Sequence, residues 1–268
     1  MKRFFADIKK YKNYVGYSAK SELKAEVAGS FLSWLWWFLD PLLYMLVYSF
    51  IAILIFGKGE PHFAVFVFTG LNIWQFFSKS VKTSVRLIVS NKGIVTKVYM
   101  PKHMFIIQKM GVYGFKMFVS FLLTAVFLIV DGVFFEPVQI HLYILWIIPL
   151  FALLFVGTFA VCLLVMHFGV FVEDLSNVIT VVLQLGFYVS GVFYSLENRL
   201  TGQYSLLGKI LTNCNPLALI MTDMRSVIFG DGSMHYMALL VWSLLSVAVA
   251  CIGIRTIYKF ENSYVKII

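Results

Sequence analysis

The chain has 268 residues, of which 60% are hydrophobic and 13% are charged, and its mean hydropathy is +0.87. Soluble domains carry about 25% charged residues, so this chain has too few polar side chains to cover a globule in water. Its three cysteines, Cys162, Cys214 and Cys251, have no spacing typical of a disulfide framework or a metal site. The composition therefore excludes a soluble, disordered or disulfide-stabilised protein and indicates a protein embedded in a bilayer.

Six apolar runs approach the roughly 20 residues that a helix needs to cross a bilayer. They cover residues 34–56, 63–80, 112–130, 142–167, 177–196 and 237–257. The first run begins too far into the chain, and is too long, for a cleaved signal peptide, so we expect it to be retained. The sequence thus predicts an all-α polytopic membrane protein with six transmembrane helices.

The distribution of Lys and Arg predicts the orientation of these helices. Six spans place both termini and the loops 81–111 and 168–176 on one side of the membrane. Together with the adjoining ends of the spans, this side holds 18 of the 22 basic residues. The other side keeps four: Lys58, Arg199, Lys209 and Arg225. Because cytoplasmic loops are enriched in Lys and Arg, we expect both termini in the cytoplasm. The net charge of +9 then needs no nucleic acid, and it favours contact with anionic membrane lipids.

Residues 1–33 are predicted to form a cytoplasmic amphipathic region at the membrane interface. A helical stripe of apolar side chains is surrounded by basic ones; the stripe consists of Phe4, Ile8, Tyr11 and Val15. Such a helix lies in the interface with its apolar side toward the acyl chains. The sequence leaves open whether this helix is a plain anchor or couples to a partner.

Residues 79–116 contain eight basic residues and no acidic one. A short apolar stripe that starts at Val81 is broken by Asn91-Lys92-Gly93, and a second apolar piece ends at Pro101. This pattern predicts a basic cytoplasmic hairpin, with a segment at 81–104 that docks a cytosolic protein. The alternative is a loop whose lysines only fix the topology. The 168–176 loop on the same side carries two charges, Glu173 and Asp174.

Residues 197–236 are predicted to form short external helices that are re-entrant or interfacial. The stretch 204–211 is apolar enough to lie at the interface. Asn215-Pro216 is a typical N-cap and first helical position, and Gly230 is expected to end that helix. The core domain would then cover residues 34–257, followed by a cytoplasmic tail over 258–268.

Two of the predicted spans have faces suited to a transport path. The side chains are aromatic with interspersed polar groups, which suit sugar rings and their hydroxyls. The candidate channel-lining residues are Trp37, Tyr44 and Tyr48 in the first span and Gln184, Phe187, Tyr188, Tyr194 and Ser195 in the fifth. The alternatives are an aromatic belt at the bilayer surface and simple helix packing.

Two charges are expected inside the membrane, Asp40 and Lys116. A charge at that depth is costly and is usually paired or exposed to water. We therefore predict that Asp40 pairs with Lys116, with Lys109 or with the interface.

The sequence predicts no catalytic residue and no metal site. Its five histidines are scattered, and no hydrolase motif occurs. Gly202 and Gly208-Lys209 resemble a phosphate-binding loop but have one residue too many between them and lack the required Ser or Thr. We therefore expect a chain that is not an enzyme by itself, has no cofactor of its own, and relies on a separate ATPase if transport consumes ATP.

The order of motifs resembles that of the ABC-2 type permeases that export cell-surface polysaccharides and polyol phosphates. The first group of matches is Glu22-Leu23-Lys24, Ser30-Phe31-Leu32, Leu35-Trp36 and Leu39-Asp40-Pro41. The second is Gly70-Leu71, Trp74, Phe76-Phe77, the stretch from Asn91 through Ile94-Val95-Thr96-Lys97-Val98-Tyr99-Met100-Pro101, Asp174, Asn215-Pro216 and Arg225. The chain departs from the family pattern at Glu26-Val27, Ser33, Met100 and Glu173.

The resemblance implies a channel in the bacterial cytoplasmic membrane that is made of two copies of the chain. Two copies of a cytoplasmic ABC ATPase, which holds ATP and magnesium, would dock beneath this channel. The substrate would be an O-antigen, capsule or teichoic-acid-like polymer carried on undecaprenyl diphosphate. The residues implied in coupling to the ATPase are Asn91, Lys92, Lys97, Tyr99, Pro101 and Asp174. Rival readings are an ABC-2 exporter of drugs or small lipids and a membrane-embedded glycosyl- or acyltransferase.

Overall fold

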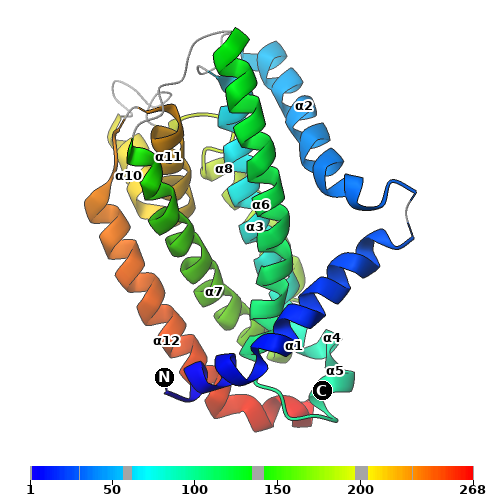
Figure 1. Ribbon diagram of the computed structural model, residues 1–268. Helices are drawn as coiled ribbons and strands as arrows, with labels where there is room; N and C mark the ends of the chain where they lie inside the picture. The colour runs from blue at the N-terminus through cyan, green and yellow to red at the C-terminus, as the bar shows by residue number, and fades with distance from the viewer. Residues whose placement is uncertain are drawn as a thin grey trace.

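The computed structural model describes residues 2–29, 31–56, 62–134, 142–196, 205–230 and 232–267, and all regular elements in these ranges are helices. Figure 1 shows them as a bundle of long, roughly aligned helices with shorter ones at both ends. The elements are α1 (Lys2–Val27), η1 (Ser33–Leu35), α2 (Trp36–Phe56), α3 (Phe63–Val85), α4 (Leu87–Ser90), α5 (Lys92–Val95), α6 (His103–Phe134), η2 (Leu142–Trp146), α7 (Ile147–Phe171), α8 (Leu175–Val189), α10 (Ser205–Cys214), α11 (Pro216–Phe229) and α12 (Tyr236–Ile267).

Within the described ranges, three helical stretches are long and apolar enough to cross a membrane. They are His103–Val130 in α6, Tyr143–Phe171 in η2 and α7, and Tyr236–Ile267 in α12. The prediction of a helical membrane protein is thereby confirmed, whereas the number of six crossings stays a prediction. The other three predicted runs, 34–56, 63–80 and 177–196, contain residues of α2, α3 and α8, respectively.

The fifth predicted run, 177–196, is not one helix to its end. Helix α8 ends at Val189 and Gly191 has a φ of +67°, a left-handed conformation that glycine adopts without strain. The 15 residues of α8 rise about 22 Å, less than the roughly 30 Å of a bilayer core. The apolar pattern continues past the break, which is why the sequence suggested a longer span.

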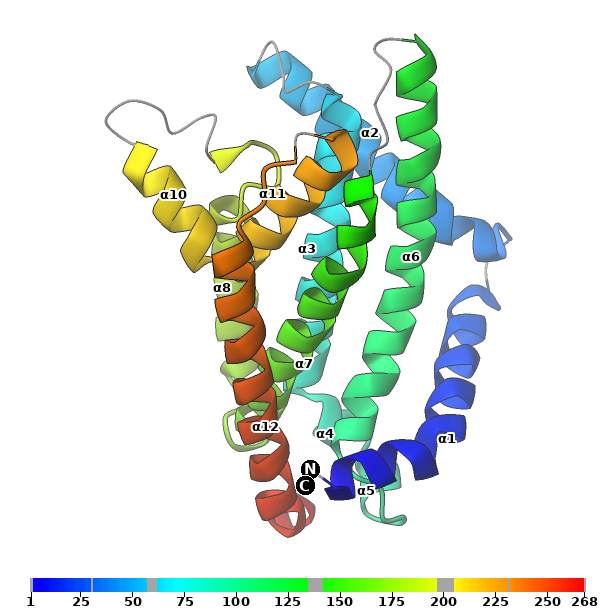
Figure 2. The same cartoon turned by 60° about the vertical axis from the view of Figure 1, so that its left-hand side comes forward.

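Helix α3 lies at the centre of the bundle. Most of its residues are buried, and it contacts α2, α6, α7, α8 and α11. Helices α7 and α12 lie along each other on one side, as Figure 2 shows. Small residues let these backbones approach closely, as is typical of helices packed in membranes: a Cβ on Gly253 of α12 would lie 2.8 Å from Cβ of Leu163 on α7.

Helix α1 packs along α6 instead of resting only on lipid. Phe4 is buried in the core, and Ile8, Tyr11 and Val15 pack against that core. The stripe predicted from the sequence therefore exists, but it contacts the protein's own helices, and the expectation that it faces the acyl chains is wrong. The exposed aromatic residues of α1, Phe5 and Tyr17, lie off this stripe.

Ionic contacts hold the second half of α1 against α6. Glu22 accepts hydrogen bonds from Lys109 at 2.6 Å and from Gln108 at 2.7 Å, and Glu26 pairs with Lys116 at 2.5 Å. Neither Lys109 nor Lys116 thus makes its ion pair with Asp40, which corrects these two of the predicted pairings; Asp40 is exposed, and its contact with the membrane interface stays a prediction. Glu22 and Glu26 stand four residues apart and therefore lie on one face of α1. Their ion pairs with Lys109 and Lys116 show that this face is turned toward α6.

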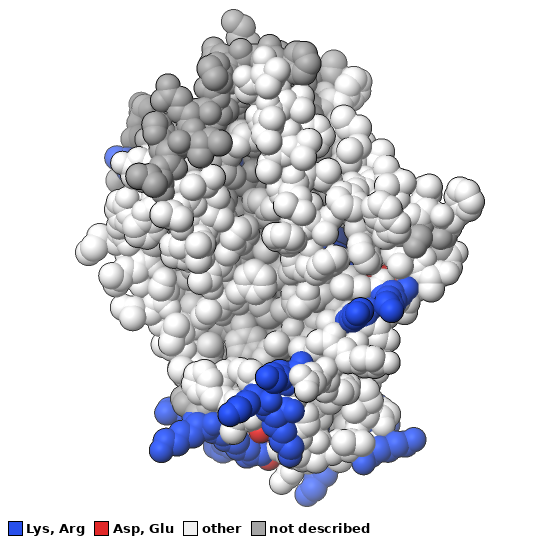
Figure 3. Space-filling view, in the orientation of Figure 1, with Lys and Arg blue, Asp and Glu red and all other residues white. Residues whose placement is uncertain are grey.

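Both termini lie at the same end of the bundle as α4 and α5 (Figure 2). Lys and Arg side chains gather on this end in the space-filling view (Figure 3). It is the end that the charge distribution assigns to the cytoplasm, and we refer to it as the basic end.

The short helices α10 and α11 lie toward the opposite end (Figure 1). Asn215 caps α11 by accepting hydrogen bonds from the backbone N–H groups of Leu217 and Ala218, and Pro216 follows it. Gly230 ends the helix with a φ of +81°. These predicted boundaries are confirmed. Most of α11 is buried, so this helix packs inside the protein, whereas residues 197–204 lie outside the described ranges.

Candidate functional site

An open groove of about 430 Å³, lined by apolar and polar side chains, lies between α3 and α8, and we call it the polar groove after its amides, hydroxyls and amines. Its lining combines aromatic rings with amides, hydroxyls and amines. Helix α2 contributes Tyr44; α3 contributes Leu71, Trp74, Gln75, Ser78, Lys79 and Lys82; α8 contributes Thr180, Leu183, Gln184, Phe187 and Tyr188. Such a surface can stack on sugar rings and hydrogen-bond their hydroxyls.

The polar groove continues toward the basic end through a second cavity of about 720 Å³, which we call the basic mouth. Lys82 and Thr180 line both cavities. The remaining lining residues of the basic mouth are Thr83, Arg86, Ser90, Ser176, Asn177 and Val181. The two cavities together form a polar track that starts at the basic end and runs along α3 and α8.

A third, small cavity of about 70 Å³ adjoins the groove and shares Gln75 and Lys79 with it. Trp37, Asp40 and Lys116 line it, so the two predicted intramembrane charges lie around one cavity although they are not ion-paired to each other. On its α3 side Asn72 donates to Thr124 at 3.2 Å and accepts from Ser120, which satisfies a buried amide between α3 and α6.

The structure brings several of the predicted channel-lining residues together. Tyr44, Gln184, Phe187 and Tyr188 line the polar groove, and Trp37 lines the neighbouring small cavity. Tyr194 and Ser195 follow the end of α8 and line neither cavity; Tyr194 donates a hydrogen bond to the carbonyl of Tyr188 at 2.6 Å. The side chain of Tyr48 lies outside the described residues. That these residues line a transport path stays a prediction.

Sequence reasoning missed the contribution of α3 to the groove. The predicted second span ends at Ser80, with Lys79 at its edge and Lys82 and Arg86 in the cytoplasmic hairpin, whereas α3 continues to Val85. Gln75, Lys79, Lys82 and Arg86 recur at spacings of three or four residues. This polar stripe on one helix face was the available signal.

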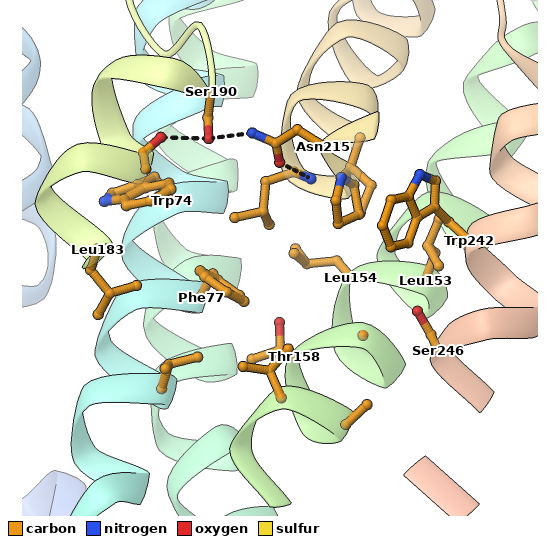
Figure 4. Close-up of a pocket in the computed structure, with 18 of the residues that line it drawn as sticks. Trp74, Phe77, Leu153, Leu154, Thr158, Leu183, Ser190, Asn215, Trp242 and Ser246 are labelled. Atoms are coloured by element: carbon orange, nitrogen blue, oxygen red, sulfur yellow. Dashed lines mark hydrogen bonds between the residues drawn. The ribbon is translucent and has the colours of Figure 1, made fainter. Parts of the chain in front are cut away.

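An apolar pocket of about 370 Å³ lies on the other side of α8 (Figure 4). Trp74 and Leu183 border both this pocket and the polar groove. In Figure 4, Ser190 and Asn215 form a hydrogen bond of 2.9 Å at its upper edge, while Leu153 and Leu154 of α7 face its interior. Because its walls are almost wholly apolar, this pocket does not extend the polar track.

The predicted coupling segment forms two short helices at the basic end. Asn91 lies between α4 and α5 and donates to the carbonyl of Leu87 at 2.8 Å. Val95 and Met100 are buried and Pro101 is buried beside them, so they fix the segment to the bundle. Lys92 and Lys97 are exposed. The segment therefore presents basic side chains outward from a fixed base.

The loop that holds Asp174 is attached to the start of α4. Arg86 donates to the backbone carbonyl of Glu173 at 3.1 Å, and Asp174 is exposed at the N-terminus of α8. Two of the regions that the resemblance assigns to ATPase coupling, around Asn91 and around Asp174, thus lie at the same end of the bundle.

Tyr99 joins three distant parts of the chain at the basic end. Its hydroxyl accepts a hydrogen bond from Arg3 of α1 and donates one to Glu261 of α12 at 3.1 Å, and Arg3 also pairs with Glu261 at 2.9 Å. The hydrogen bond to Glu261 raises the pKa of Arg3, and desolvation raises the pKa of Tyr99. Tyr99 is therefore hydrogen-bonded within the chain, although more than half of its surface is exposed.

No group of three or more His, Cys, Asp or Glu side chains in the described part of the chain is placed to hold a metal ion.

The chain is similar over nearly its full length to known export permeases, although no family model matches it. It is 25% identical over 248 residues to the O-antigen export system permease protein RfbA of Klebsiella pneumoniae, which is 92% of each chain. It is 27% identical over 230 residues to the O-antigen export system permease protein RfbA of Myxococcus xanthus, 85% of each chain. This similarity confirms the resemblance of the chain to the ABC-2 type permeases of polysaccharide export.

Proposed function

We propose that the chain is the transmembrane permease subunit of an ATP-driven exporter that moves an undecaprenyl-diphosphate-linked polysaccharide across the bacterial cytoplasmic membrane. The class of polymer would be O-antigen, capsule or a teichoic-acid-like glycan. The observation that carries this proposal is the polar track, because its aromatic, amide and hydroxyl side chains suit a polyhydroxylated chain and lie between apolar helices. The similarity to O-antigen export permeases supports it.

We further propose that two copies form the channel. Several groove residues are exposed in the single chain: Tyr188 is 67% and Tyr44 50% exposed, and Lys79 is exposed beside them. A charged and polar surface of this kind is costly against lipid and normally faces the inside of an assembly. A second copy facing the groove would shield these residues and enclose the track.

The ATPase would bind at the basic end, on the segment 81–104 and the loop that holds Asp174. The exposed Lys92 and Lys97 offer positive charge, and exposed Ile94 and Val98 offer apolar area beside them. The N-terminal region, joined to this segment through Arg3 and Tyr99, would move with it.

Export can be tested by inactivating the gene in its host. We expect the surface polysaccharide to be lost and its lipid-linked form to accumulate in the cytoplasmic leaflet, with both effects reversed by the wild-type gene. Labelled sugars and extraction of lipid-linked glycan measure both pools. Unchanged surface polysaccharide without such accumulation would contradict the proposal.

Charge reversal in the coupling segment tests the docking site. We expect Lys92→Glu with Lys97→Glu to weaken the complex with the ATPase at least about tenfold, equivalent to about 1.4 kcal/mol, because two attractions become repulsions. The yield of ATPase that co-purifies with tagged permease measures this. The control is Lys20→Glu with Lys24→Glu, the same charge change on exposed residues of the second half of α1. Equal losses in both double variants would show that bulk charge, and not this segment, binds the ATPase.

A further inference from the structure

Three cationic side chains follow one face at the border of the polar track. Lys79 and Lys82 of α3 and Arg86 just after it stand three and four residues apart, a spacing that keeps them on one helical face. All three are exposed. Lys79 and Lys82 line the polar groove, and Lys82 and Arg86 line the basic mouth. Lys82 therefore contributes its charge to both cavities.

The opposite wall of the basic mouth is the first part of α8. Ser176, Asn177 and Thr180 line it. Hydroxyl and amide side chains can donate to phosphate oxygens, and those of Ser176 and Asn177 lie on this wall, whereas the Thr180 hydroxyl already donates to the carbonyl of Ser176 at 2.8 Å. The side chains of Ser176 and Asn177 and the cations Lys82 and Arg86 thus line the same cavity from two sides.

The acidic groups nearby are not among the described residues that line this cavity. Asp40 lies around the small cavity that it shares with Lys79 and Lys116, and not among the lining residues of the mouth. Glu173 contacts Arg86 through its backbone carbonyl, and Asp174 is exposed at the start of α8. Among the described residues, the lining of the basic mouth includes two cations and no carboxylate.

We propose that Lys82 and Arg86, with Lys79 beyond them, bind the diphosphate headgroup of a membrane lipid. This inference rests on the proposed export function and deepens it by naming where the substrate's charged group is held. Lys82 and Arg86 stand about 6 Å apart along the helix axis, the rise of four residues, so their long side chains can reach two adjacent phosphates together. Arg and Lys side chains form charge-assisted hydrogen bonds with phosphate oxygens. The sugar-compatible part of the groove, around Gln184 and Tyr188, continues from this site.

Binding to the isolated full-length permease tests the site without the ATPase. The chain is placed in nanodiscs of zwitterionic phosphatidylcholine, and the probe is tritium-labelled undecaprenyl diphosphate. We expect Lys82→Gln with Arg86→Gln to raise the dissociation constant at least tenfold. The control, Lys9→Gln with Lys12→Gln, removes two exposed charges from α1 and should leave it within twofold. Lys82→Arg with Arg86→Lys, which keeps both charges, should restore most of the affinity.

Competition distinguishes the possible sources of the phosphate. Undecaprenyl diphosphate without label should displace the probe at least tenfold better than inorganic pyrophosphate or phosphatidylglycerol. Equal displacement by pyrophosphate would show that the site binds a soluble anion and not a lipid. Equal displacement by phosphatidylglycerol would show that it binds any anionic lipid. Either result overturns the proposal. Equal weakening by the α1 control variant would overturn it as well.

If the double variant is not produced in folded form, Lys79→Gln alone is expected to weaken binding about threefold, and unchanged binding overturns the proposal.

The failure of this inference and of the proposed function are distinguishable. Unaltered binding in the variants, together with loss of surface polysaccharide when the gene is inactivated, would remove the site and leave the export function standing. Lipid diphosphate binding that depends on Lys82 and Arg86, together with unchanged surface polysaccharide, would keep the site and remove the export function.

Discussion

Replacing Gly169 by alanine is expected to lower the midpoint of thermal unfolding by about 5 to 10 °C. A Cβ on Gly169 of α7 would lie 2.0 Å from the carbonyl oxygen and 2.8 Å from the carbonyl carbon of Val85, at the end of α3. These are backbone atoms, so no side-chain rotation relieves the overlap, and the two helices must separate. The displaced element carries Arg86 and α4, so we also expect weaker binding of the ATPase. Fluorescence-detected size-exclusion chromatography of heated, detergent-solubilised protein measures the midpoint.

Gly16→Ala is the matched control. Gly16 also lies inside a helix, but a Cβ there would meet no atom within 4 Å. Alanine is favoured over glycine in helices by about 1 kcal/mol, so this variant should be unchanged or slightly more stable. If Gly169→Ala behaved like Gly16→Ala, the close approach of α7 to the end of α3 would be wrong.

The second large effect is expected from Arg225→Met. Arg225 of α11 is buried and donates hydrogen bonds to the carbonyls of Phe66, Gly191 and Val192 at 3.1, 2.9 and 2.7 Å. Its guanidinium also lies 3.5 Å from the centre of the Phe66 ring. These contacts attach α11 and the segment after α8 to α3. Hydrogen bonds of charged donors contribute about 1.5 to 3 kcal/mol each, so we expect a loss of about 3 kcal/mol or more.

Denaturation of the purified protein, followed by Trp fluorescence, measures this loss. Arg255→Met, at an exposed position of α12, is the control and should change the stability by less than about 0.5 kcal/mol. Arg225→Lys keeps the charge but not the fork of donors and should remain well below wild type. Gly70→Ala should reproduce part of the effect, because its Cβ would lie 2.4 Å from Nη2 of Arg225. Equal stability of Arg225→Met and Arg255→Met would refute this attachment.

Several local features follow from the sequence because their causes are local. The apolar runs predicted helices, and each run contains one. The cap formed by Asn215 and the turn at Gly230 depend on the backbone preferences of those residues alone, and both ends of α11 were predicted. The stripe of Phe4, Ile8, Tyr11 and Val15 likewise follows from helical periodicity.

Part of the candidate site was predictable for the same reason. Tyr44 on α2 and the α8 residues Gln184, Phe187 and Tyr188 share a cavity because helical spacing places the latter on one face. Periodicity failed beyond Val189, where the chain leaves the helix at Gly191, so Tyr194 and Ser195 lie elsewhere. The α3 wall with Lys79 and Lys82 was missed because the apolar run ends at Ser80, whereas the helix itself continues to Val85 and carries its polar stripe with it.

The sequence by itself determined that this protein is a helical membrane protein, which end of it is basic, and which residues share a face of each helix. Only the tertiary structure decided what each face contacts: that the stripe of α1 packs on the protein core, that Lys116 pairs with Glu26, and that Lys82 faces α8. Periodicity defines a face but not its neighbour, because the rotation and axial shift between helices depend on close contacts such as that of Gly169 with Val85.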